Sequence, residues 1–148
     1  MLNVTEFDLT QKLVNEYMID SDKVAHVQLN NPLKHALLVL TKTGYNAVPV
    51  LDYDGTFKGL ISKSHIIEKM FGLDQIEVDL LDEITVKHVM DNDIKTLQLG
   101  ETLEKALHLL IDHNFVCVVN HSNIMEGILT RRQLLKQIRN QFYQQKTI

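Results

Sequence analysis

The chain has 148 residues, a formal net charge of −4 and 45% hydrophobic residues. This composition excludes global disorder, and the length suits one compact domain or two half-domains that share a core. The mild negative charge disfavours general nucleic-acid binding, and the longest apolar run, Ala36 to Leu40, is too short to span a bilayer.

The first half of the chain predicts a helix over residues 5–18, followed by a strand, a helix, two strands and a second helix. The helix after the first strand has Asn31 as its cap, Pro32 in its first turn and Gly44 at its end, where a left-handed residue is favoured. Ser62 is a good cap for the last helix. The predicted strands of this half cover 24–29, 45–51 and 57–61.

The second half repeats this order. Residues 31–51 align with 101–121 at an offset of 70, and residues 58–70 align with 126–138 after a two-residue shift. Asn114 replaces Gly44 as the left-handed helix end, and Thr130 replaces Ser62 as the last cap. The predicted strands of this half cover 95–99, 115–119 and 125–129.

Each copy is therefore a β-α-β-β-α unit. One unit alone leaves a sheet face poorly covered, whereas two copies packed by pseudo-twofold symmetry bury a shared core. We expect an α+β fold with two such motifs and a cleft between them. The expected ranges are an N-terminal helix (1–15), a first motif (16–71), a linker (72–86), a second motif (87–140) and a C-terminal tail (141–148).

The stretch "EGILTRRQLLKQI" places two arginines at the start of a predicted basic helix, Arg131 to Lys146. Thr130 should cap this helix, with Gln133 three residues further on. The side chains of Arg131 and Arg132 oppose the helix dipole by about 0.3–1 kcal/mol each, a cost that a bound phosphate would reverse. Free N–H groups at a helix start form an anion site, and arginine can hold phosphate oxygens through two parallel hydrogen bonds.

The repeat, "GYNAVPVLD" and the pair "GLIS" and "GILT" resemble a tandem pair of CBS domains, known as a Bateman module. The resemblance covers roughly residues 16–138. Four further stretches are similar to the small stand-alone bacterial CBS proteins that bind cyclic di-AMP: "MIDSDKVAHVQL", "HALLVLTKTGY", "FVCV" and "GILTRRQLLK". The resemblance implies a homodimer that binds an adenine nucleotide between its motifs and regulates a protein partner. In that family the ligand-free form is associated with the (p)ppGpp synthetase/hydrolase.

The resemblance also implies which residues line the clefts. The ligand-binding residues of the main cleft would be Lys23, Val24, Ala25, His26, Tyr45, Asn46, Ala47, Thr130, Arg131, Arg132 and Gln133. The pseudo-symmetric cleft would use Ser62, Lys63, Ser64, His65, Lys95, Phe115 and Val116. We expect this second cleft to be weaker or empty, because Lys63 and Ser64 stand where the main cleft has two arginines.

The absence of an aspartate from the start of each last helix suggests which nucleotide binds. CBS domains that bind AMP or ATP usually carry Ser/Thr-x-x-Asp at the last helix, with the aspartate on the ribose hydroxyls. Here His65 and Gln133 hold that place. This favours cyclic di-AMP, whose 3′-hydroxyl is esterified, with AMP or ATP as possible competitors. The alternatives are a general AMP/ADP/ATP energy sensor and, with less support, a DNA-binding regulator that uses the basic C-terminal helix.

Enzymatic chemistry and a metal site are not expected. The sequence lacks the motifs G-x-S-x-G, G-x-G-x-x-G and the P-loop, and its seven histidines lack ligand spacing. The single cysteine, Cys117, lies in the apolar stretch "FVCVV" and is expected to be a buried thiol. The N-terminus lacks the regions of a signal peptide, so we expect a reduced, cytoplasmic protein. We also expect no cofactor. Plainer roles stay open for three candidates: Tyr45 as a core strand residue, Lys23 as a surface lysine and the two arginines as solvated charges.

Overall fold

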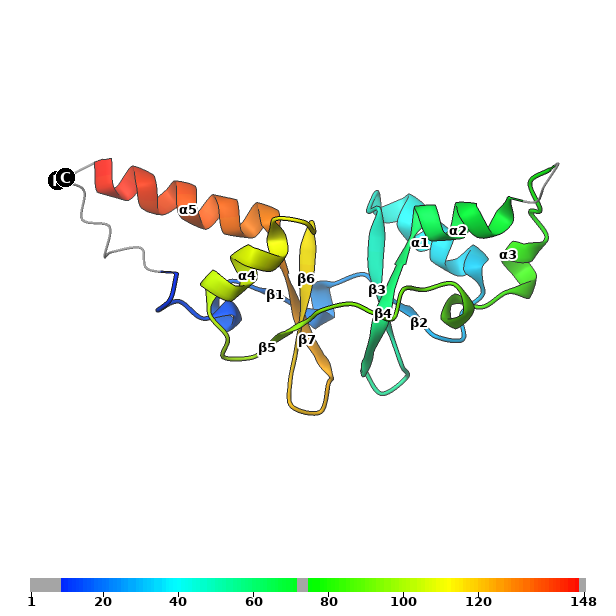
Figure 1. The fold of residues 1–148 in the computed structure, drawn as a ribbon, viewed down its shortest axis with the longest axis horizontal. Coiled ribbons are helices and arrows are strands. Elements are labelled where there is room, and N and C mark those ends of the chain that lie inside the picture. The colour runs from blue at the N-terminus through cyan, green and yellow to red at the C-terminus, as the bar shows by residue number, and fades with distance from the viewer. Residues whose placement is uncertain (1–8, 72–74, 147–148) are drawn as a thin grey trace. The chain divides into compact units, whose positions relative to one another are not determined.

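The computed structural model describes residues 9–71 and 75–146, and these residues form two compact units (Figure 1). The central unit is Ala25–Ile94, and the terminal unit combines the chain through Val24 with the chain from Lys95 onward. Within the described part, no helix is both long and apolar enough to cross a membrane.

The central unit contains a three-stranded sheet in the order β2-β3-β4. The β2–β3 pair is parallel and the β3–β4 pair antiparallel, with an irregularity between Val50 and Leu51. The core of the unit lies between this sheet and the helices and contains Leu33, Ala36 and Leu40 of the first helix. The elements are β2 (Val27–Gln28), α1 (Leu33–Thr43), β3 (Ala47–Leu51), β4 (Phe57–Ser62), α2 (Lys63–Met70), α3 (Leu80–Glu83) and the 3-10 turn η4 (Val86–His88).

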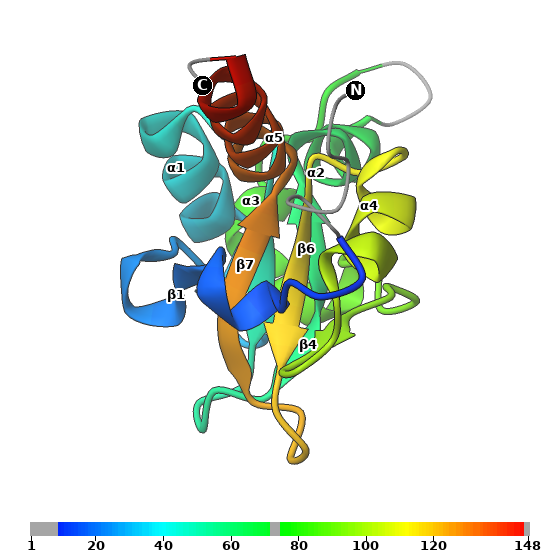
Figure 2. The same ribbon diagram turned by 90° about the vertical axis from the view of Figure 1, so that its left-hand side faces the viewer.

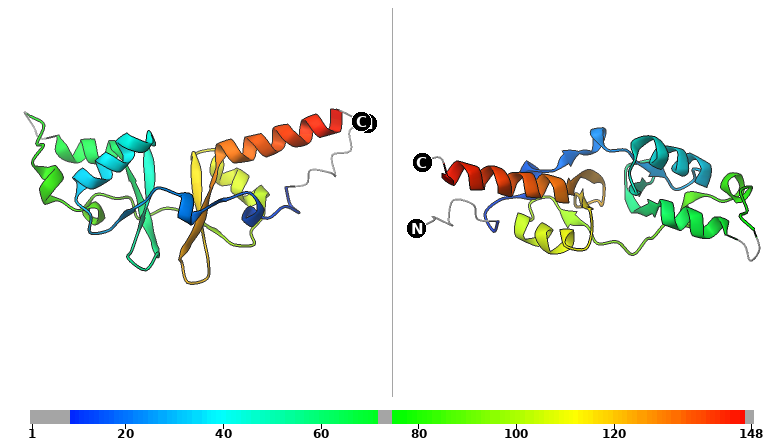
Figure 3. Two further views of the ribbon diagram at one scale, coloured as in Figure 1. Left: turned by 180° about the vertical axis from the view of Figure 1, so that it is seen from behind. Right: turned by 90° about the horizontal axis from the view of Figure 1, so that it is seen from above.

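The terminal unit repeats this arrangement with an additional strand, in the order β1-β7-β6-β5 (Figure 2). The β5–β6 pair is parallel and β6–β7 antiparallel, with the same irregularity at Val118 and Val119. The last helix continues well past the sheet (Figure 3). The elements are η2 (Val14–Glu16), β1 (Ile19–Asp20), η3 (Ser21–Lys23), β5 (Leu97–Gln98), α4 (Leu103–Leu110), β6 (Phe115–Val119), β7 (Met125–Thr130) and α5 (Arg131–Lys146).

The predicted order of elements, two β-α-β-β-α motifs in an α+β fold, is confirmed. The first strand of each copy is shorter than expected, because only Val27–Gln28 and Leu97–Gln98 pair with a neighbour. Alternation along the longer strands places Val116 and Val118 in the core with α4 and α5. The core of the terminal unit thus fixes β6, β7 and the start of α5 relative to one another.

Each unit includes a segment from the sequence range of the other motif. In the terminal unit, β1 pairs with β7, and the N–H of Leu103 at the start of α4 donates to the carbonyl of Lys12. In the central unit, Asp91 and Leu60 exchange backbone hydrogen bonds, and the N–H of Leu33 donates to the carbonyl of Ile84. The chain therefore crosses between the units at Val24–Ala25 and at Ile94–Lys95, which lie inside the ranges 16–71 and 87–140 expected for the two motifs.

The N-terminal helix expected over residues 1–15 is not present in its described part. Residues 1–8 lie outside the described residues, residues 9–11 form a turn, and Val14–Glu16 form a 3-10 turn. Leu13 bridges to Thr102, and the N–H of Val14 donates to the carbonyl of Glu101. These long-range backbone bonds compete with the i→i−4 bonds that a helix would need.

Two expected helix boundaries are also wrong. The Oδ1 of Asn31 accepts the N–H of Gln28, and Pro32 holds the cap position of α1. Gly44 does end α1 with φ +77°, as expected. Asn114 does not repeat this conformation, since Asn123 is the one described non-glycine residue with positive φ. Without a left-handed end, α4 stops at Leu110, whereas α1 extends to Thr43, the position equivalent to residue 113.

Candidate anion site at the start of α5

The start of α5 follows β7 without a loop. Thr130 ends β7, and its Oγ1 accepts the N–H of Gln133 at 3.0 Å, which confirms the expected cap. The N–H of Arg131 donates to the carbonyl of Asn114 at 2.8 Å. The N–H of Arg132 has no partner among the described residues, so it remains available to an anion at the positive end of the helix.

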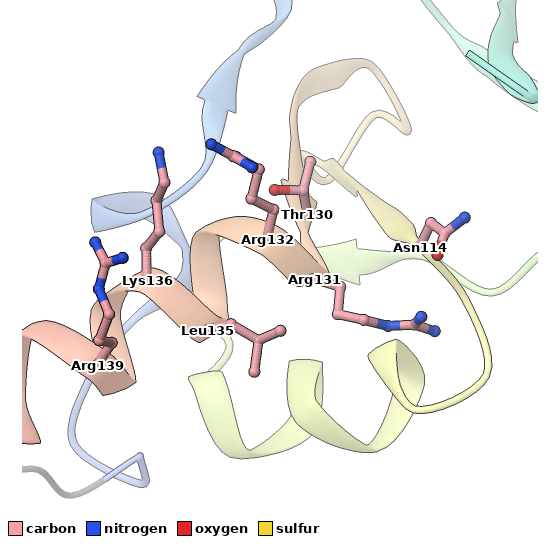
Figure 4. Close-up of a pocket in the computed structure, with 7 residues that line it drawn as sticks. All are labelled: Asn114, Thr130, Arg131, Arg132, Leu135, Lys136 and Arg139. Carbon is pink, nitrogen blue, oxygen red and sulfur yellow. The ribbon is translucent and has the colours of Figure 1, made fainter. Parts of the chain in front are cut away.

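A pocket of about 490 Å³ lies beside this helix start (Figure 4). Its lining is cationic, with four basic side chains and no acidic residue. The lining residues are Asn114, Thr130, Arg131, Arg132, Leu135, Lys136 and Arg139. Because a helix start and four basic residues line one pocket, the local electrostatic field favours an anionic ligand.

The two adjacent arginines are held differently. The Nε of Arg131 donates to the carbonyl of Leu110 at 2.8 Å, and its Nη2 donates to the carbonyl of Ile111 at 3.1 Å. Both carbonyls belong to the end of α4, where positive charge is favourable. In contrast, Arg132 is exposed, and its guanidinium has no hydrogen-bond partner in the described part of the chain. In Figure 4 the two side chains point in different directions from α5.

Sequence reasoning missed three helical lining residues: Leu135, Lys136 and Arg139. The missed signal is the helix period, since Leu135 and Arg139 follow Arg131 at i+4 and i+8, and Lys136 follows Arg132 at i+4. The ion pairs found among the described residues, Lys34–Asp82 and Lys105–Glu101, do not involve these cations. The positive charge of the pocket is therefore not neutralised by neighbouring carboxylates.

The predicted main-cleft residues divide between the two units. Thr130, Arg131 and Arg132 line the pocket, and Gln133 lies in the same helical turn but not in the lining. Lys23 and Val24 belong to the same unit, at η3 beside β7, with Lys23 exposed and Val24 9% exposed. The remaining residues, Ala25, His26, Tyr45, Asn46 and Ala47, belong to the central unit.

Tyr45 is 56% exposed, so the alternative that it packs in the core is wrong. It lies between the helix-ending Gly44 and the start of β3. The carbonyl of Asn46 accepts the N–H of Lys63 at 3.0 Å, the counterpart of the bond from Arg131 to Asn114. The same backbone hydrogen bond therefore forms at the start of the last helix in both motifs.

The residues predicted for the second cleft are similarly divided. Ser62, Lys63, Ser64 and His65 open α2 in the central unit, and the Oγ of Ser62 accepts the N–H of His65 at 3.1 Å. The Nδ1 of His65 is buried without a hydrogen-bond partner. The terminal unit contributes Lys95, Phe115 and Val116, of which Val116 is 4% exposed and packs in the core.

The single thiol is part of the core. Cys117 is 1% exposed, as expected, and burial raises its pKa well above the ordinary range. A buried neutral thiol is a poor nucleophile and a poor metal ligand. No group of three or more His, Cys, Asp or Glu residues suited to a metal ion occurs among the residues that the structure describes.

The repeated motif and the geometry at the start of α5 define a tandem pair of CBS domains. The CBS domain family model matches residues 14–72 and 86–140, and the chain belongs to this family. It is 46% identical over 138 residues to the cyclic di-AMP receptor B of Bacillus subtilis (strain 168), a match that covers 93% of this chain and 94% of the relative.

Solved structures agree with this assignment. A CBS domain-containing protein from Bacillus anthracis is 48% identical, with a TM-score of 0.82 over 89% of this chain and 96% of that chain. The CbpB protein of Listeria monocytogenes in complex with c-di-AMP is 46% identical, with a TM-score of 0.81 over 87% of this chain and 96% of that chain. The resemblance inferred from the sequence is therefore confirmed.

Proposed function

We propose that this protein is a receptor for cyclic di-AMP that works by binding and without chemistry. The observation that carries the proposal is the cationic pocket at the capped start of α5, which is lined by Thr130, Arg131 and Arg132. Relatives at 46% identity supply the ligand: one is named a cyclic di-AMP receptor, and another was solved with c-di-AMP.

The pocket suits a ligand held by its phosphates. A cyclic dinucleotide carries two phosphates, and the pocket offers four cations and an unpaired N–H at the helix start. Gln133 stands where a ribose-reading aspartate would be, so a mononucleotide with a free vicinal diol gains less. AMP or ATP then binds as a weaker competitor, and a general energy sensor is the second candidate.

The remaining ligand contacts are proposed from the family resemblance. Lys23 to His26 would read the adenine through backbone groups, Tyr45 would stack on a base, and Asn46 and Ala47 would contact the same ligand. The exposure of Lys23 and Tyr45 supports these roles, because both side chains are accessible to a ligand. The set around Ser62 to His65, Lys95, Phe115 and Val116 is proposed as a weaker second site, since Lys63 carries no planar fork.

Calorimetry with cyclic di-AMP, AMP, ATP and (p)ppGpp tests the ligand. We expect micromolar or tighter binding of cyclic di-AMP and weaker binding of the others. Tighter binding of ATP would replace the proposal with the energy-sensor alternative. A gel-shift experiment with duplex DNA at low salt addresses the DNA-binding alternative, which a salt-dependent shift would support.

We further propose that the receptor is a cytoplasmic homodimer and that its ligand-free form regulates the (p)ppGpp synthetase/hydrolase. The partner assignment is supported by the family resemblance alone. Large apolar side chains exposed on α2 and α5, including Ile67 (41%) and Phe142 (52%), suit burial against a second copy. Light scattering measures the dimer, and co-purification of the enzyme with and without cyclic di-AMP measures the regulated interaction. Equal enzyme binding in both conditions would contradict ligand control.

A further inference from the structure

Arg131 and Arg132 are adjacent in sequence but differ in how many of their hydrogen-bond donors are already in use. Arginine holds a phosphate most strongly through two parallel N–H bonds from one edge of its planar guanidinium. In Arg131, the edge formed by Nε and Nη2 is occupied by the carbonyls of Leu110 and Ile111. That edge can take a phosphate only if both bonds to α4 break.

The need for this anchor follows from the end of α4. In the first motif, Gly44 adopts φ +77° and its N–H donates to the carbonyl of Leu40 at 3.0 Å, which closes α1. In the second motif, Asn114 does not adopt that conformation, and α4 ends at Leu110. The last carbonyls of a helix need donors from elsewhere when no left-handed residue closes it, and a cation there is favourable.

The two motifs differ in the side chain of the first residue of the last helix, which is Lys63 in one and Arg131 in the other. The backbone N–H of Arg131 donates to Asn114, and the N–H of Lys63 donates to Asn46 in the same way. The first motif has a glycine end and a lysine, whereas the second has no left-handed end and an arginine with two bonds to the helix carbonyls. The two hydrogen bonds from the guanidinium of Arg131 therefore take the place of the bond that the N–H of Gly44 makes at the end of α1.

We propose that Arg131 is a positioning residue that fastens the end of α4 to the start of α5, which leaves the phosphate contact of the proposed function to Arg132. Arg131 donates its Nε edge to α4 both without and with ligand, and keeps Asn114 and the first turn of α5 in place around the pocket. Arg132 is exposed and unpartnered, and it begins to donate when the phosphate arrives. The role of Arg132 rests on the proposed function, whereas the anchor of Arg131 is a property of the ligand-free protein.

Nuclear magnetic resonance of the arginine Nε–H groups in the full chain tests both roles, with resonances assigned from Arg131→Lys and Arg132→Lys. In the ligand-free protein, we expect the Nε–H of Arg131 to exchange with solvent at least about tenfold more slowly than that of Arg132, because a bonded donor is protected. Added cyclic di-AMP should slow the exchange of Arg132 and leave that of Arg131 nearly unchanged. Equal exchange rates of the two Nε–H groups without ligand would contradict the proposal that Arg131 holds the end of α4.

Binding and amide exchange supply the readouts that separate positioning from direct contact. Arg132→Gln should weaken cyclic di-AMP binding by about 10- to 100-fold without changing the backbone exchange of residues 111–114. Arg131→Lys retains the positive charge but lacks the planar fork, so it should speed that backbone exchange in the ligand-free protein. Loss of affinity in Arg131→Lys with unchanged exchange at 111–114 overturns the positioning role. If cyclic di-AMP changes no arginine resonance, the role of Arg132 fails together with the proposed function, while the ligand-free exchange rates still decide the role of Arg131.

Discussion

Gly127 of β7 lies directly against the main-chain carbonyl of Ile19, and a Cβ at position 127 would clash with that oxygen. The contact arises because β1 pairs with β7, with Ile19 opposite Ile128. Gly59, at the equivalent position of the first motif, meets the carbonyl of Asp91 in the same way. The two glycines mark where the opening segment of one motif pairs with the last strand of the other.

Replacing Gly127 with alanine should therefore weaken the pairing of β1 with β7. The free energy of unfolding should fall by about 1–3 kcal/mol, because the added methyl group forces the backbones apart. Denaturant unfolding measures the loss, and amide exchange at Ile19 and Asp20 should rise. Gly59→Ala is the matched control, since it should loosen the Asp91–Leu60 bonds and leave exchange at Ile19 unchanged. Unaltered stability in Gly127→Ala would show that the close approach is absent.

The two helix caps predict a second pair of variants. Thr130→Val and Ser62→Ala each remove a side-chain acceptor for a backbone N–H, of Gln133 and His65 respectively. Each change should lower the free energy of unfolding by about 1 kcal/mol. Cyclic di-AMP affinity should fall in Thr130→Val, since Thr130 lines the pocket, and should change little in Ser62→Ala. Equal affinity losses in both variants would argue against the pocket beside α5 as the main site.

The cations one and two turns into α5 should contribute to ligand binding over a distance. Lys136→Gln and Arg139→Gln each remove a positive charge from the pocket lining. We expect the affinity for cyclic di-AMP to fall by about two- to fivefold at low salt, a range typical of partly exposed charges. The loss should shrink at high ionic strength because salt screens the interaction. Lys42→Gln, which alters an exposed lysine of α1, is the control and should bind as the unaltered chain does.

Glu101 should make stability depend on acid pH. Its burial acts to raise the pKa, but hydrogen bonds from Lys105 and from the N–H of Gln98 outweigh this and hold the pKa below the ordinary value of 4.5. The folded state therefore binds this proton less readily than the unfolded chain does. The contribution of Glu101 to the free energy of unfolding is present above about pH 4.5 and is lost as the pH falls through the lowered pKa.

Glu101→Gln should lower the free energy of unfolding at pH 7 by about 0.3–0.5 kcal/mol, the range of an i,i+4 pair. The difference between the variant and the unaltered chain should narrow below pH 4.5. Denaturant unfolding across this pH range measures the effect. A constant difference at all pH values would contradict the lowered pKa.

Cys117 should be unreactive in the folded protein. It is 1% exposed, and burial raises its pKa, so the reactive thiolate is scarce at neutral pH. A thiol reagent should label it only at the rate of unfolding, and labelling should become fast in denaturant. Rapid labelling without denaturant would mean that the core of the terminal unit opens readily.

Local sequence signals predicted several features correctly because their causes are local. The cap at Thr130 needs only a hydroxyl three residues before the N–H that it accepts. Gly44 ends α1 because glycine tolerates the left-handed conformation at little cost. The failure at Asn114 is also instructive: asparagine can adopt that conformation, but the fork of Arg131 closes α4 by another route.

The sequence by itself determined the tandem repeat, the order of strands and helices in each copy and the cationic start of α5, because hydrophobic period, helix caps and charge are readable along the chain. Only the tertiary structure decided that the opening segment of each motif pairs with the last strand of the other. It also decided that the guanidinium of Arg131 donates to carbonyls at the end of α4, whereas that of Arg132 has no such partner among the described residues. Both depend on hydrogen bonds between residues far apart in the chain. The bonds of Arg131 reach back 20 and 21 residues to Ile111 and Leu110, and no local periodicity encodes which carbonyl a donor will meet.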